Sequence, residues 1–392
     1  MGEASATGTI ARPAATAGIA RAHRHAATSD RSMPVSIPIT ASLGLVTIAV
    51  TGPDPLAAAV AHDLDLPPAE GHAQVALEMS FPGVDTPLPG TRLEATRMLR
   101  ASFERDAHPV LHVKGSLPLS HAWLPDPLYR FVHPAHLTRA GYGAQLVSYQ
   151  LFDGAAQLAN LSAGQSFLHA SALERDGRRV AIVARGGMGK TGTLLQLVSS
   201  GGWRYLSDDW TVVESSGVVH RSHKPVQVFP RNLTQLPRGE ALLLAGRTAG
   251  DRFSWWVRKR LGRARGMRRK VTAAELFGDD QMGSAGPLSE VLLVRRGDVG
   301  QIVEQDVDAA ELAGQAAVMV AEELAPSLRL LGPHLGELSG GTWISTDQVH
   351  AATEGVLARA VAECERLEVR VPDAMPEPEI ERYLVDRLSQ GP

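Results

Sequence analysis

Short apolar runs separated by proline-rich and charged segments dominate residues 34–164. Short runs rich in Val, Ile and Leu are typical of strands, and a longer pattern with apolar residues about three to four positions apart is typical of a helix. The pattern therefore predicts a smaller N-terminal α/β domain, in which no chemical motif stands out. The expected strands are residues 42–51, 75–79 and 110–113; the expected helices are residues 54–64, with Asp54 as cap and Pro55 in the first turn, and residues 142–161.

After residue 165 the pattern changes to paired strands around tight turns. Residues 168–173 and 180–184 flank Asp176-Gly177, and Asp-Gly is a strong hairpin signal because both positions tolerate positive φ. The second strand leads into a glycine-rich turn, then a helical stretch that closes at Gly201, and then another short strand. A further hairpin is expected from residues 210–213 and 218–220, turned at residues 215–217.

The C-terminal part mixes helix and strand signals. Residues 288–295 predict a strand, with residues 302–303 pairing back on it. Asp308 resembles the start of a capping box, so we expect a helix that begins there and is stopped by Pro326. These patterns predict a mixed-sheet α/β domain over residues 165–372. Its last elements are a helix from Ser345 to about residue 367 and a strand at residues 369–371, followed by a peripheral tail at residues 373–392.

Composition narrows the class of protein. The chain has 392 residues, enough for about two domains, and 44% of them are hydrophobic, so a sizeable core can be buried. The net charge of -3 argues against wholesale nucleic-acid binding. The single cysteine, Cys364, excludes a disulfide framework and a cysteine-based zinc site, and is typical of a reducing cytoplasm. No apolar run approaches the roughly 20 residues of a membrane span. We therefore expect a cytoplasmic protein that binds no membrane, with residues 1–33 as a disordered leader.

Residues 178–209 carry the chemistry. A strand, a glycine-rich turn, a Lys-Thr pair, a helix, a strand and an acid pair follow one another, which is the layout of a phosphate-binding loop with its metal-binding partner. Lys190 would contact the terminal phosphates and Thr191 would bind Mg²⁺. Asp208 and Asp209 would divide the roles of general base and metal ligand, with Asp209 among the expected metal ligands. The residues expected to contact ATP are Gly186, Gly187, Met188, Gly189, Lys190, Thr191 and Gly192.

One position departs from the usual loop. The pattern G-x-x-x-x-G-K-[ST] places its first glycine at Ala184. Alanine is the smallest replacement, so we expect a tightened loop that still binds phosphate. A turn that only caps a helix is the alternative, and the flanking strand, helix and acid pair disfavour it. His169, on the neighbouring strand, would either orient one aspartate or share its proton, or be a satisfied core residue.

At these residues the chain resembles the C-terminal catalytic domain of the HPr kinase/phosphorylase family and its kinase-like relatives in bacterial peptide-modification pathways. The family loop G-x-S-G-x-G-K-S corresponds to residues 184–191, its histidine to His169, and its double aspartate to Asp208-Asp209. The resemblance implies a P-loop kinase domain with a fold like that of phosphoenolpyruvate carboxykinase, with ATP and Mg²⁺. It also implies an aspartate that deprotonates an acceptor hydroxyl and a functional His169, and it is consistent with a homo-oligomer.

Two family segments are not found. No acidic L-E-x-R-G run follows the second hairpin, and residues 226–228 occupy the place where it would fall. No R-P-x-x-P-G-R-N run precedes Leu288. These departures argue against HPr as the substrate and against phosphorylase activity. Relatives that phosphorylate a serine of a peptide or protein are the closer analogy.

Basic residues form two clusters, one at residues 221–231 (Arg221, His223, Lys224 and Arg231) and one at residues 247–270. Residues 247–270 hold ten Arg or Lys against one acid, Asp251, so this stretch would bind an acidic peptide or nucleotide phosphates, or else be a solvated loop. His133 and His136 lack a third metal ligand nearby, so we expect an ordinary loop there. The candidate substrate-binding residues are Arg221, Lys224, Arg231, Arg269 and Lys270.

The leading hypothesis is an ATP-dependent kinase that phosphorylates a hydroxyl of a peptide, protein or small molecule. One alternative is a nucleotide-binding regulatory or scaffold protein without phosphotransfer. Another is an ATPase or GTPase switch, although the N-K-x-D-like element of a GTPase is not found.

Overall fold

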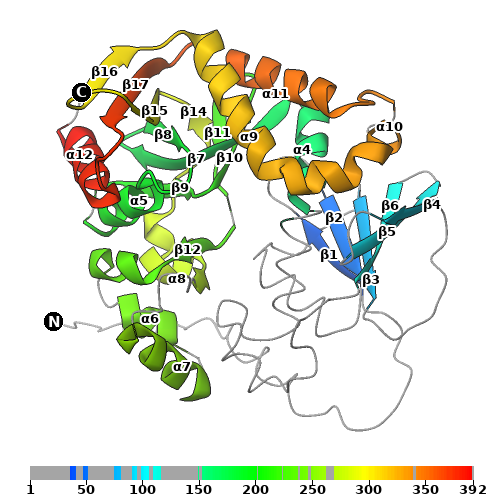
Figure 1. Ribbon diagram of the computed structural model, residues 1–392, viewed down its shortest axis with the longest axis horizontal. Coiled ribbons are helices and arrows are strands. Elements are labelled where there is room, and N and C mark those ends of the chain that lie inside the picture. The colour runs from blue at the N-terminus through cyan, green and yellow to red at the C-terminus, as the bar shows by residue number, and fades with distance from the viewer. Residues whose placement is uncertain are drawn as a thin grey trace, which may run out of the picture. The chain divides into compact units, whose positions relative to one another are not determined.

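Figure 1 shows the protein as a computed structural model. The structure describes residues 36–40, 47–51, 75–80, 91–94, 99–105, 109–115, 149 and 152–390, apart from residues 201, 223, 237–238, 246–248, 262–268 and 339–340. The chain divides into two compact units, residues 1–34 and 35–392, and every described residue lies in the second. The expected leader, the helix at residues 54–64 and the His133/His136 pair lie outside the described residues.

Six short strands form one mixed sheet in the order β1-β2-β3-β6-β5-β4. The β2, β3 and β6 strands run parallel, and the remaining neighbours pair antiparallel. The strands predicted at residues 75–79 and 110–113 are confirmed, and the one predicted at residues 42–51 is confirmed over its last five residues. The bounds are β1 (Ser36–Thr40), β2 (Thr47–Thr51), β3 (Val75–Ser80), β4 (Thr91–Glu94), β5 (Leu99–Arg105) and β6 (Pro109–Gly115).

A nine-stranded sheet carries the rest of the fold in the order β14-β11-β10-β7-β8-β15-β17-β16, with β9 also paired to β7. At its centre β8, β15 and β17 run parallel, and the flanking pairs are antiparallel. The bounds are β7 (Gln165–Arg175), β8 (Arg178–Ala184), β9 (Arg204–Ser207), β10 (Trp210–Glu214), β11 (Val218–His220), β14 (Gly286–Pro287), β15 (Glu290–Gly297), β16 (Val303–Asp306) and β17 (Glu365–Pro372).

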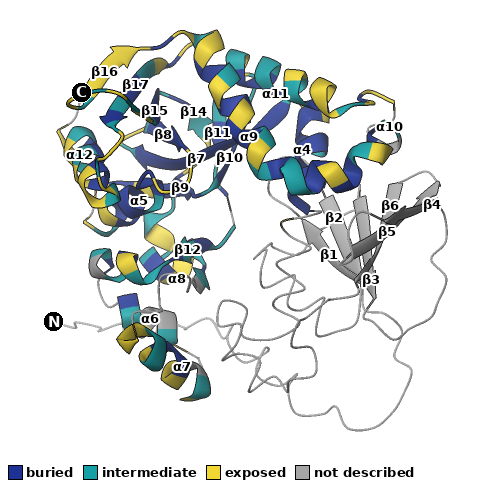
Figure 2. Cartoon of the chain, in the orientation of Figure 1, coloured by how far each residue is buried: buried dark blue, intermediate teal, exposed yellow. Residues whose placement is uncertain are grey.

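Helices cover both faces of this sheet (Figure 1). Val180 and Ile182 of β8 join a core with α5 (Lys190–Ser199) and α12 (Glu377–Ser389). Ala181 and Val183 face the other way, toward α9 (Ala309–Leu331) and α11 (Thr346–Ala360). The central strands are therefore buried on both sides, as Figure 2 shows, and read as continuous apolar runs. The predicted mixed-sheet α/β class is confirmed for this part of the chain.

Both predicted hairpins are confirmed. The turn between β7 and β8 has Asp176 at φ 51° and Gly177 at φ 83°, the positive angles that an Asp-Gly turn requires. The β10–β11 hairpin turns at residues 215–217, where Gly217 has φ 86°. The two hairpins are joined by the pairing of β10 with β7, which gives the order β11-β10-β7-β8. The strand before the glycine-rich turn and the strand after the acid pair are therefore both neighbours of β7, which lies between them.

The predicted pairing of residues 302–303 with the strand at 288–295 is wrong. Val303 is the first residue of β16, which pairs antiparallel with β17. The reason is that both edges of β15 are already occupied, by β8 on one side and by β17 on the other. The strand reaches the sheet edge one position further out.

The prediction that Pro326 stops a helix is also wrong. Asp308 caps α9 as expected, accepting from the N–H of Ala310 at 2.8 Å, but the helix continues through Pro326 to Leu331. An interior proline costs a helix about 3 kcal/mol. The turn beyond it buries Leu328, Leu330 and Leu331, and each buried leucine contributes about 1.5–3 kcal/mol, enough to offset that cost.

The last elements differ from their predicted bounds. Ser345 caps α11 as expected, but the helix ends at Ala360, and residues 365–372 form β17, which pairs along the whole of β15. The expected peripheral tail forms α12, which packs on α5 and buries Ile380, Leu384 and Leu388 completely. At the other end, α4 (Asp153–Ser162) packs on β7 and α9, although a boundary at residue 164 would place it in the N-terminal domain.

The described parts of the basic stretch form α7 (Ala249–Arg260) and the first two residues of β13 (Arg269–Val271), one strand of a small two-stranded sheet. This sheet pairs β13 with β12 (Val226–Val228), and Trp255 of α7 is buried with it in the same core. No helix in the described ranges is long and apolar enough to cross a membrane. The remaining short elements are η3 (Pro230–Gln235), α6 (Gly239–Leu244), α8 (Ala273–Phe277), η5 (Asp279–Gln281), η6 (Gly332–His334) and α10 (Leu335–Leu338).

Candidate functional site

The glycine-rich turn joins the carboxyl end of β8 to the N-terminus of α5. Gly187 and Gly189 have φ angles of 77° and 79°, a left-handed conformation that favours glycine and lets the backbone turn back on itself. The first N–H groups of a helix lack partners inside it, and the helix dipole favours an anion at this end. The turn also lies at the carboxyl end of parallel strands, where open α/β sheets bind ligands. The geometry suits a phosphate.

Lys190 is buried at the base of this turn, with 6% of its surface exposed. Its Nζ donates to the carbonyl oxygens of Ala184 and Arg185, the latter at 3.2 Å, and lies 3.0 Å from Nε2 of His169. Burial lowers the pKa of Lys190, and the nearby Asp209 and Asp208 oppose that shift. The ammonium is thus held against the loop by the carbonyl of Ala184, the residue that replaces the usual glycine.

His169 lies on β7, directly opposite Trp210 of β10, with the two rings edge to face at 5.6 Å. Burial, and then the charge of Lys190, lowers the pKa of His169 to about 4, so the ring is neutral at pH 7. Nε2 can then accept from the ammonium, which leaves the proton on Nδ1, and Nδ1 has no hydrogen-bond partner among the described residues. His169 therefore contacts Lys190. One of its predicted roles, orienting an aspartate or sharing its proton, required a contact with an aspartate instead.

Asp208 is the buried member of the acid pair, with 4% of its surface exposed. It accepts from Ser171 Oγ at 2.5 Å and from Thr191 Oγ1 at 3.0 and 3.1 Å. Burial, and then the charge of Asp209, raises the pKa of Asp208 to about 6. The carboxylate and the first hydroxyl of α5 therefore meet beside the phosphate-binding turn.

Asp209 has a different setting. Its backbone lies at φ 66°, a left-handed conformation that costs a non-glycine residue about 1–3 kcal/mol and that clusters at functional sites. One of its carboxylate oxygens, Oδ2, accepts from Gln227 Nε2 at 2.9 Å. Asp209 is partly exposed to the cavity, whereas Asp208 points down toward Thr191 and Ser171. The two neighbouring carboxylates are thus aimed at different partners.

These groups line one cavity of about 520 Å³, within the range of small-molecule sites. Its wall includes the turn from Gly186 to Thr191, His169 and both aspartates. The cavity is strongly polar and carries both signs of charge, as a site for a charged substrate with a counter-ion would. Its charged side chains are Lys190, Lys224, Arg231, Lys270, Asp153, Asp208, Asp209, Glu323 and Glu377.

Only some of the predicted substrate-binding residues line the cavity. Lys224, Arg231 and Lys270 line the cavity, while half-buried Arg221 lies outside its wall. Arg269 lies in β13, and its side chain is outside the described part. Arg231 pairs with Glu377 of α12 at 3.1 Å and stacks over Phe229 at 4.8 Å. Gly192, predicted to contact ATP, also lies away from the cavity: a Cβ there would be 2.1 Å from Glu381 Oε1, so α12 packs directly on this glycine.

Sequence reasoning missed several cavity residues. Asp153, at the start of α4, accepts from Lys224 Nζ and, at 3.2 Å, from Trp210 Nε1. Ser171 and Gln227 could have been found, because Ser171 lies two positions after His169 on one face of β7, and Gln227 alternates with two buried valines. Asp153, Glu323 and Glu377 come from distant helices and carry no local signal.

A divalent cation fits the oxygen donors present. Mg²⁺ is usually held by one or two carboxylates together with substrate phosphates, and not by an all-protein cage. In agreement, the described residues contain no group of three or more His, Cys, Asp or Glu side chains that could hold a metal alone. Thr191 Oγ1 and the Asp208 carboxylate, 3.0 Å apart beside the phosphate-binding turn, are the hard oxygen donors such an ion prefers.

Comparison with known proteins gives little more. No protein-family model matches the chain, and no curated protein matches it. Among solved structures, the chain is similar to the structure of the HPr(Ser) kinase/phosphatase from Coxiella burnetii, with 10% sequence identity over 57% of this chain and 96% of that one. The TM-score of 0.26 is too low for this similarity to carry an argument. The case for function therefore depends on the residues of the cavity.

Proposed function

We propose that the protein is an ATP-dependent kinase that transfers the γ-phosphate to a hydroxyl of a peptide, protein or small molecule. The main observation that supports this proposal is the hydrogen bond from Thr191 to Asp208 at the start of α5. Lys190 and a second carboxylate, Asp209, line the same cavity. A glycine turn alone would bind an anion. The added hydroxyl, two acids and lysine are the set that phosphoryl transfer uses for positioning and charge stabilisation.

The phosphates would lie on the turn from Gly186 to Thr191. In the structure Lys190 is held by the carbonyl oxygens of Ala184 and Arg185. A phosphate is a stronger partner for the ammonium than a neutral carbonyl, because it carries a full opposite charge. His169, neutral and 3.0 Å from Nζ, would keep the lysine directed at the phosphates without adding a second positive charge.

Thr191 and Asp208 would hold Mg²⁺, so we assign Asp208 and not Asp209 as the nearer metal ligand. When bound, Mg²⁺ would neutralise charge on the β- and γ-phosphates. The assignment follows the hydrogen bonds, since Asp208 contacts the Thr191 hydroxyl and Asp209 does not. Loss of the Asp208 carboxylate is then expected to weaken Mg²⁺-dependent nucleotide binding itself.

Asp209 would accept the acceptor's proton. Gln227 holds its Oδ2, leaving Oδ1 to take the proton from the acceptor hydroxyl. As that O–H bond breaks, the acceptor oxygen forms a bond to the γ-phosphorus, the bond from this phosphorus to the bridging oxygen breaks, and ADP leaves. One proton passes to Asp209 and one phosphoryl group passes to the acceptor, so atoms and charge balance.

A nucleotide-binding regulatory or scaffold protein is the second candidate. The observation in its favour is Gln227, an amide on the strand where the resembled family has an acidic segment. This reading predicts tight ATP binding, no ADP formation and no labelled acceptor.

The test uses the full chain with Mg²⁺ and γ-labelled ATP against serine-containing peptides and small hydroxyl compounds. Lys190→Met and Asp209→Asn should abolish transfer, whereas Asp298→Asn, an exposed acid in the loop after β15, is the matched control and should keep it. Transfer that survives in both cavity variants would overturn the proposal. Nucleotide binding without transfer to any acceptor in the unsubstituted chain would favour the scaffold instead.

A further inference from the structure

We infer that the outer face of α7 is a docking surface for an acidic segment of a polypeptide that carries the acceptor hydroxyl. This face, called here the α7 surface, consists of Arg252, Phe253, Trp256, Arg260 and Leu261. The inference rests on the proposed kinase function, because it concerns how an acceptor would be brought to the cavity. It narrows the acceptor from any hydroxyl compound to a peptide or protein with acidic residues.

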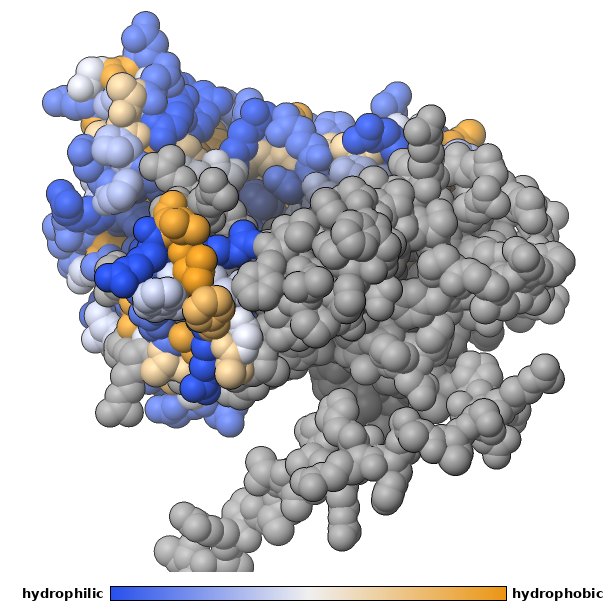
Figure 3. Space-filling view, turned by 60° about the horizontal axis from the view of Figure 1, so that its bottom comes forward, coloured by the Kyte–Doolittle hydropathy of each residue, from blue (hydrophilic) through white to orange (hydrophobic). Residues whose placement is uncertain are grey.

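Apolar side chains are exposed together on the α7 surface. Phe253, Trp256 and Leu261 are 56%, 53% and 62% exposed, and they are three of only seven large hydrophobic side chains that are exposed in the described ranges. The rings of Phe253 and Trp256 stack at 6.1 Å, and Arg260 lies 5.3 Å over the Trp256 ring. Trp and Arg are the residue types that most often dominate binding energy at protein interfaces. Figure 3 brings forward the side of the molecule on which Figure 1 places α7, and shows apolar surface (orange) beside strongly hydrophilic surface (blue) there.

The side of α7 that adjoins this surface fixes the helix in place. Trp255 is 1% exposed and donates to Glu240 of α6 at 3.1 Å, and Lys259 donates to the same carboxylate at 2.6 Å. Residues 252, 253, 256 and 260 are all exposed and share one side of the helix, at spacings of three and four. A preset surface of this kind binds a partner without the cost of ordering the helix first.

The charge of this segment selects the partner. Residues 247–270 carry ten basic side chains and one acid, in a chain whose net charge is -3. A local excess of positive charge favours a negatively charged partner, and the stacked aromatic rings favour one that also has apolar side chains. An acidic polypeptide segment with a few apolar residues meets both requirements. A membrane-bound helix inserts a whole apolar side into the lipid. On the α7 surface only three large apolar side chains are exposed, and Trp255 is already buried in the protein, which favours a polypeptide partner over a membrane.

The position along the chain links docking to chemistry. Ten residues after Arg260, Lys270 of β13 lines the phosphate cavity, and β13 pairs with β12, whose Gln227 holds Asp209. Trp255 of α7 also shares a core with Val226, Val228 and Val271 of these two strands. In this proposal, a polypeptide held on the α7 surface would present neighbouring residues to the cavity as a second, intramolecular contact. Such tethering raises the effective concentration of the acceptor without new contacts in the cavity.

Binding is tested with the full chain and without nucleotide, by fluorescence anisotropy of a labelled synthetic peptide of alternating glutamate and leucine that ends in serine. The Arg252→Glu/Arg260→Glu variant should bind at least about 10-fold more weakly, and Trp256→Ala about 10-fold more weakly, as for a central interface residue. The matched control is Arg359→Glu/Arg382→Glu, which reverses two exposed charges on α11 and α12 and should change affinity less than about two-fold. Thermal unfolding of each variant shows that the fold is kept.

Vesicles of phosphatidylglycerol and a single-stranded DNA oligonucleotide are measured beside the peptide. Preferential binding of either one, lost in the same variants, would overturn the inference, as would equal peptide affinity in the control and α7 variants. The Lys190→Met variant should bind the peptide normally, so a failed kinase proposal leaves this result readable. Conversely, phosphorylation of the peptide with the same KM by the α7 variants and by the unsubstituted chain would support the kinase proposal and overturn the inference of a docking surface.

Discussion

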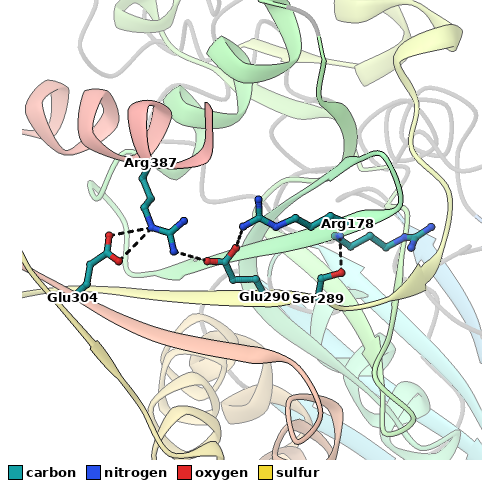
Figure 4. A network of polar contacts seen from close by, with 6 residues as sticks. Arg178, Ser289, Glu290, Glu304 and Arg387 are labelled. Carbon is teal, nitrogen blue, oxygen red and sulfur yellow. Dashed lines mark hydrogen bonds and ion pairs between the residues drawn. The ribbon is translucent and has the colours of Figure 1, made fainter. Parts of the chain in front are cut away.

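The two ends of β8 hold two buried clusters of charge that differ in how completely they are paired. At the start of β8, Glu290 is fully buried and is bonded by both Arg178 and Arg387, and Arg387 also binds Glu304 at 3.1 Å (Figure 4). At the end of β8, two adjacent aspartates face a single lysine. The same strand therefore joins a network of ion pairs to a cluster whose aspartates accept from neutral hydroxyl and amide groups.

The difference shows which cluster is built for a ligand. A buried carboxylate between two guanidinium groups has its charge offset inside the protein, which is what a structural ion pair requires. At the other end burial lowers the pKa of Lys190 and raises that of Asp208, and His169 Nδ1 has no described partner. Groups with perturbed pKa values gathered in a cavity are typical of functional sites. In the proposed function, the divalent cation bound with the nucleotide would supply the positive charge that offsets these two carboxylates.

The largest effect is expected from Asp209→Asn. If Asp209 is the base, phosphoryl transfer should fall about 10²–10⁴-fold, while ATP still binds because Lys190 and Thr191 are untouched. Stability should hold or rise, since the substitution removes a like charge beside Asp208. Steady-state transfer, nucleotide titration and thermal unfolding measure the three quantities. Normal transfer, or a loss explained by unfolding, would break the distinction between the two clusters.

The reverse pattern is expected at the start of β8. Glu290→Gln leaves Arg178 and Arg387 beside a neutral amide, and breaking a buried pair in this way costs about 3–5 kcal/mol. Urea unfolding should record that loss, while the folded protein keeps its kcat/KM. Glu304→Gln is the matched control, because Glu304 is 31% exposed and a pair of that kind contributes about 0–1 kcal/mol. Equal costs at the two positions would show that the network is not centred on Glu290.

A smaller effect is expected where α12 meets the phosphate end. A Cβ at residue 192 would lie 2.1 Å from the Glu381 carboxylate, so Gly192→Ala should cost about 1–3 kcal/mol of overpacking. Shortening Glu381 to Ala should relieve most of that clash, giving a coupling energy in a double-mutant cycle. Gly186→Ala is the control for stability, since a Cβ there meets nothing within 4 Å. Additive costs for residues 192 and 381 would contradict the contact.

Local signals predicted the parts of the fold that are short in sequence. Asp176-Gly177 made the β7–β8 hairpin, and the strand, glycine turn and helix followed in the expected order. Pairings between distant segments had no such signal, so the partner of residues 302–303 was wrong. Pro326 was misjudged because the burial of the leucines beyond it depends on α4, which packs against α9 from far along the chain.

The site divides in the same way. Lys190, Thr191 and the aspartate pair come from one continuous stretch and meet in the cavity. Glu323 and Glu377 reach it from α9 and α12, and their places depend on helix packing that no local pattern encodes. The contact between Gly192 and Glu381 also had no local signal, because it depends on α12 packing against α5.

The smallest effect is the change in the free energy of unfolding per pH unit that His169 and Asp208, at the end of β8, cause in the ligand-free protein. The pKa of His169 is lowered by burial from 6.5 to about 4, so between these values only the unfolded chain is protonated there and stability rises with pH. The pKa of Asp208 is raised by burial from 3.8 to about 6, so the folded chain retains a proton and stability falls with pH. Each slope is at most about 1.4 kcal/mol per pH unit, and the two oppose one another.

Substitution should therefore separate these two contributions. Relative to the unsubstituted chain, the free energy of unfolding of His169→Gln should rise less steeply between pH 4 and pH 6, because only the Asp208 slope remains. Asp208→Asn should rise more steeply over the same range. Urea unfolding across that range compares the slopes, and slopes that shift in the same direction in both variants would contradict the assignment. Opposite shifts would assign the titration to His169 and Asp208, the two groups at the end of β8 whose pKa values burial moves in opposite directions.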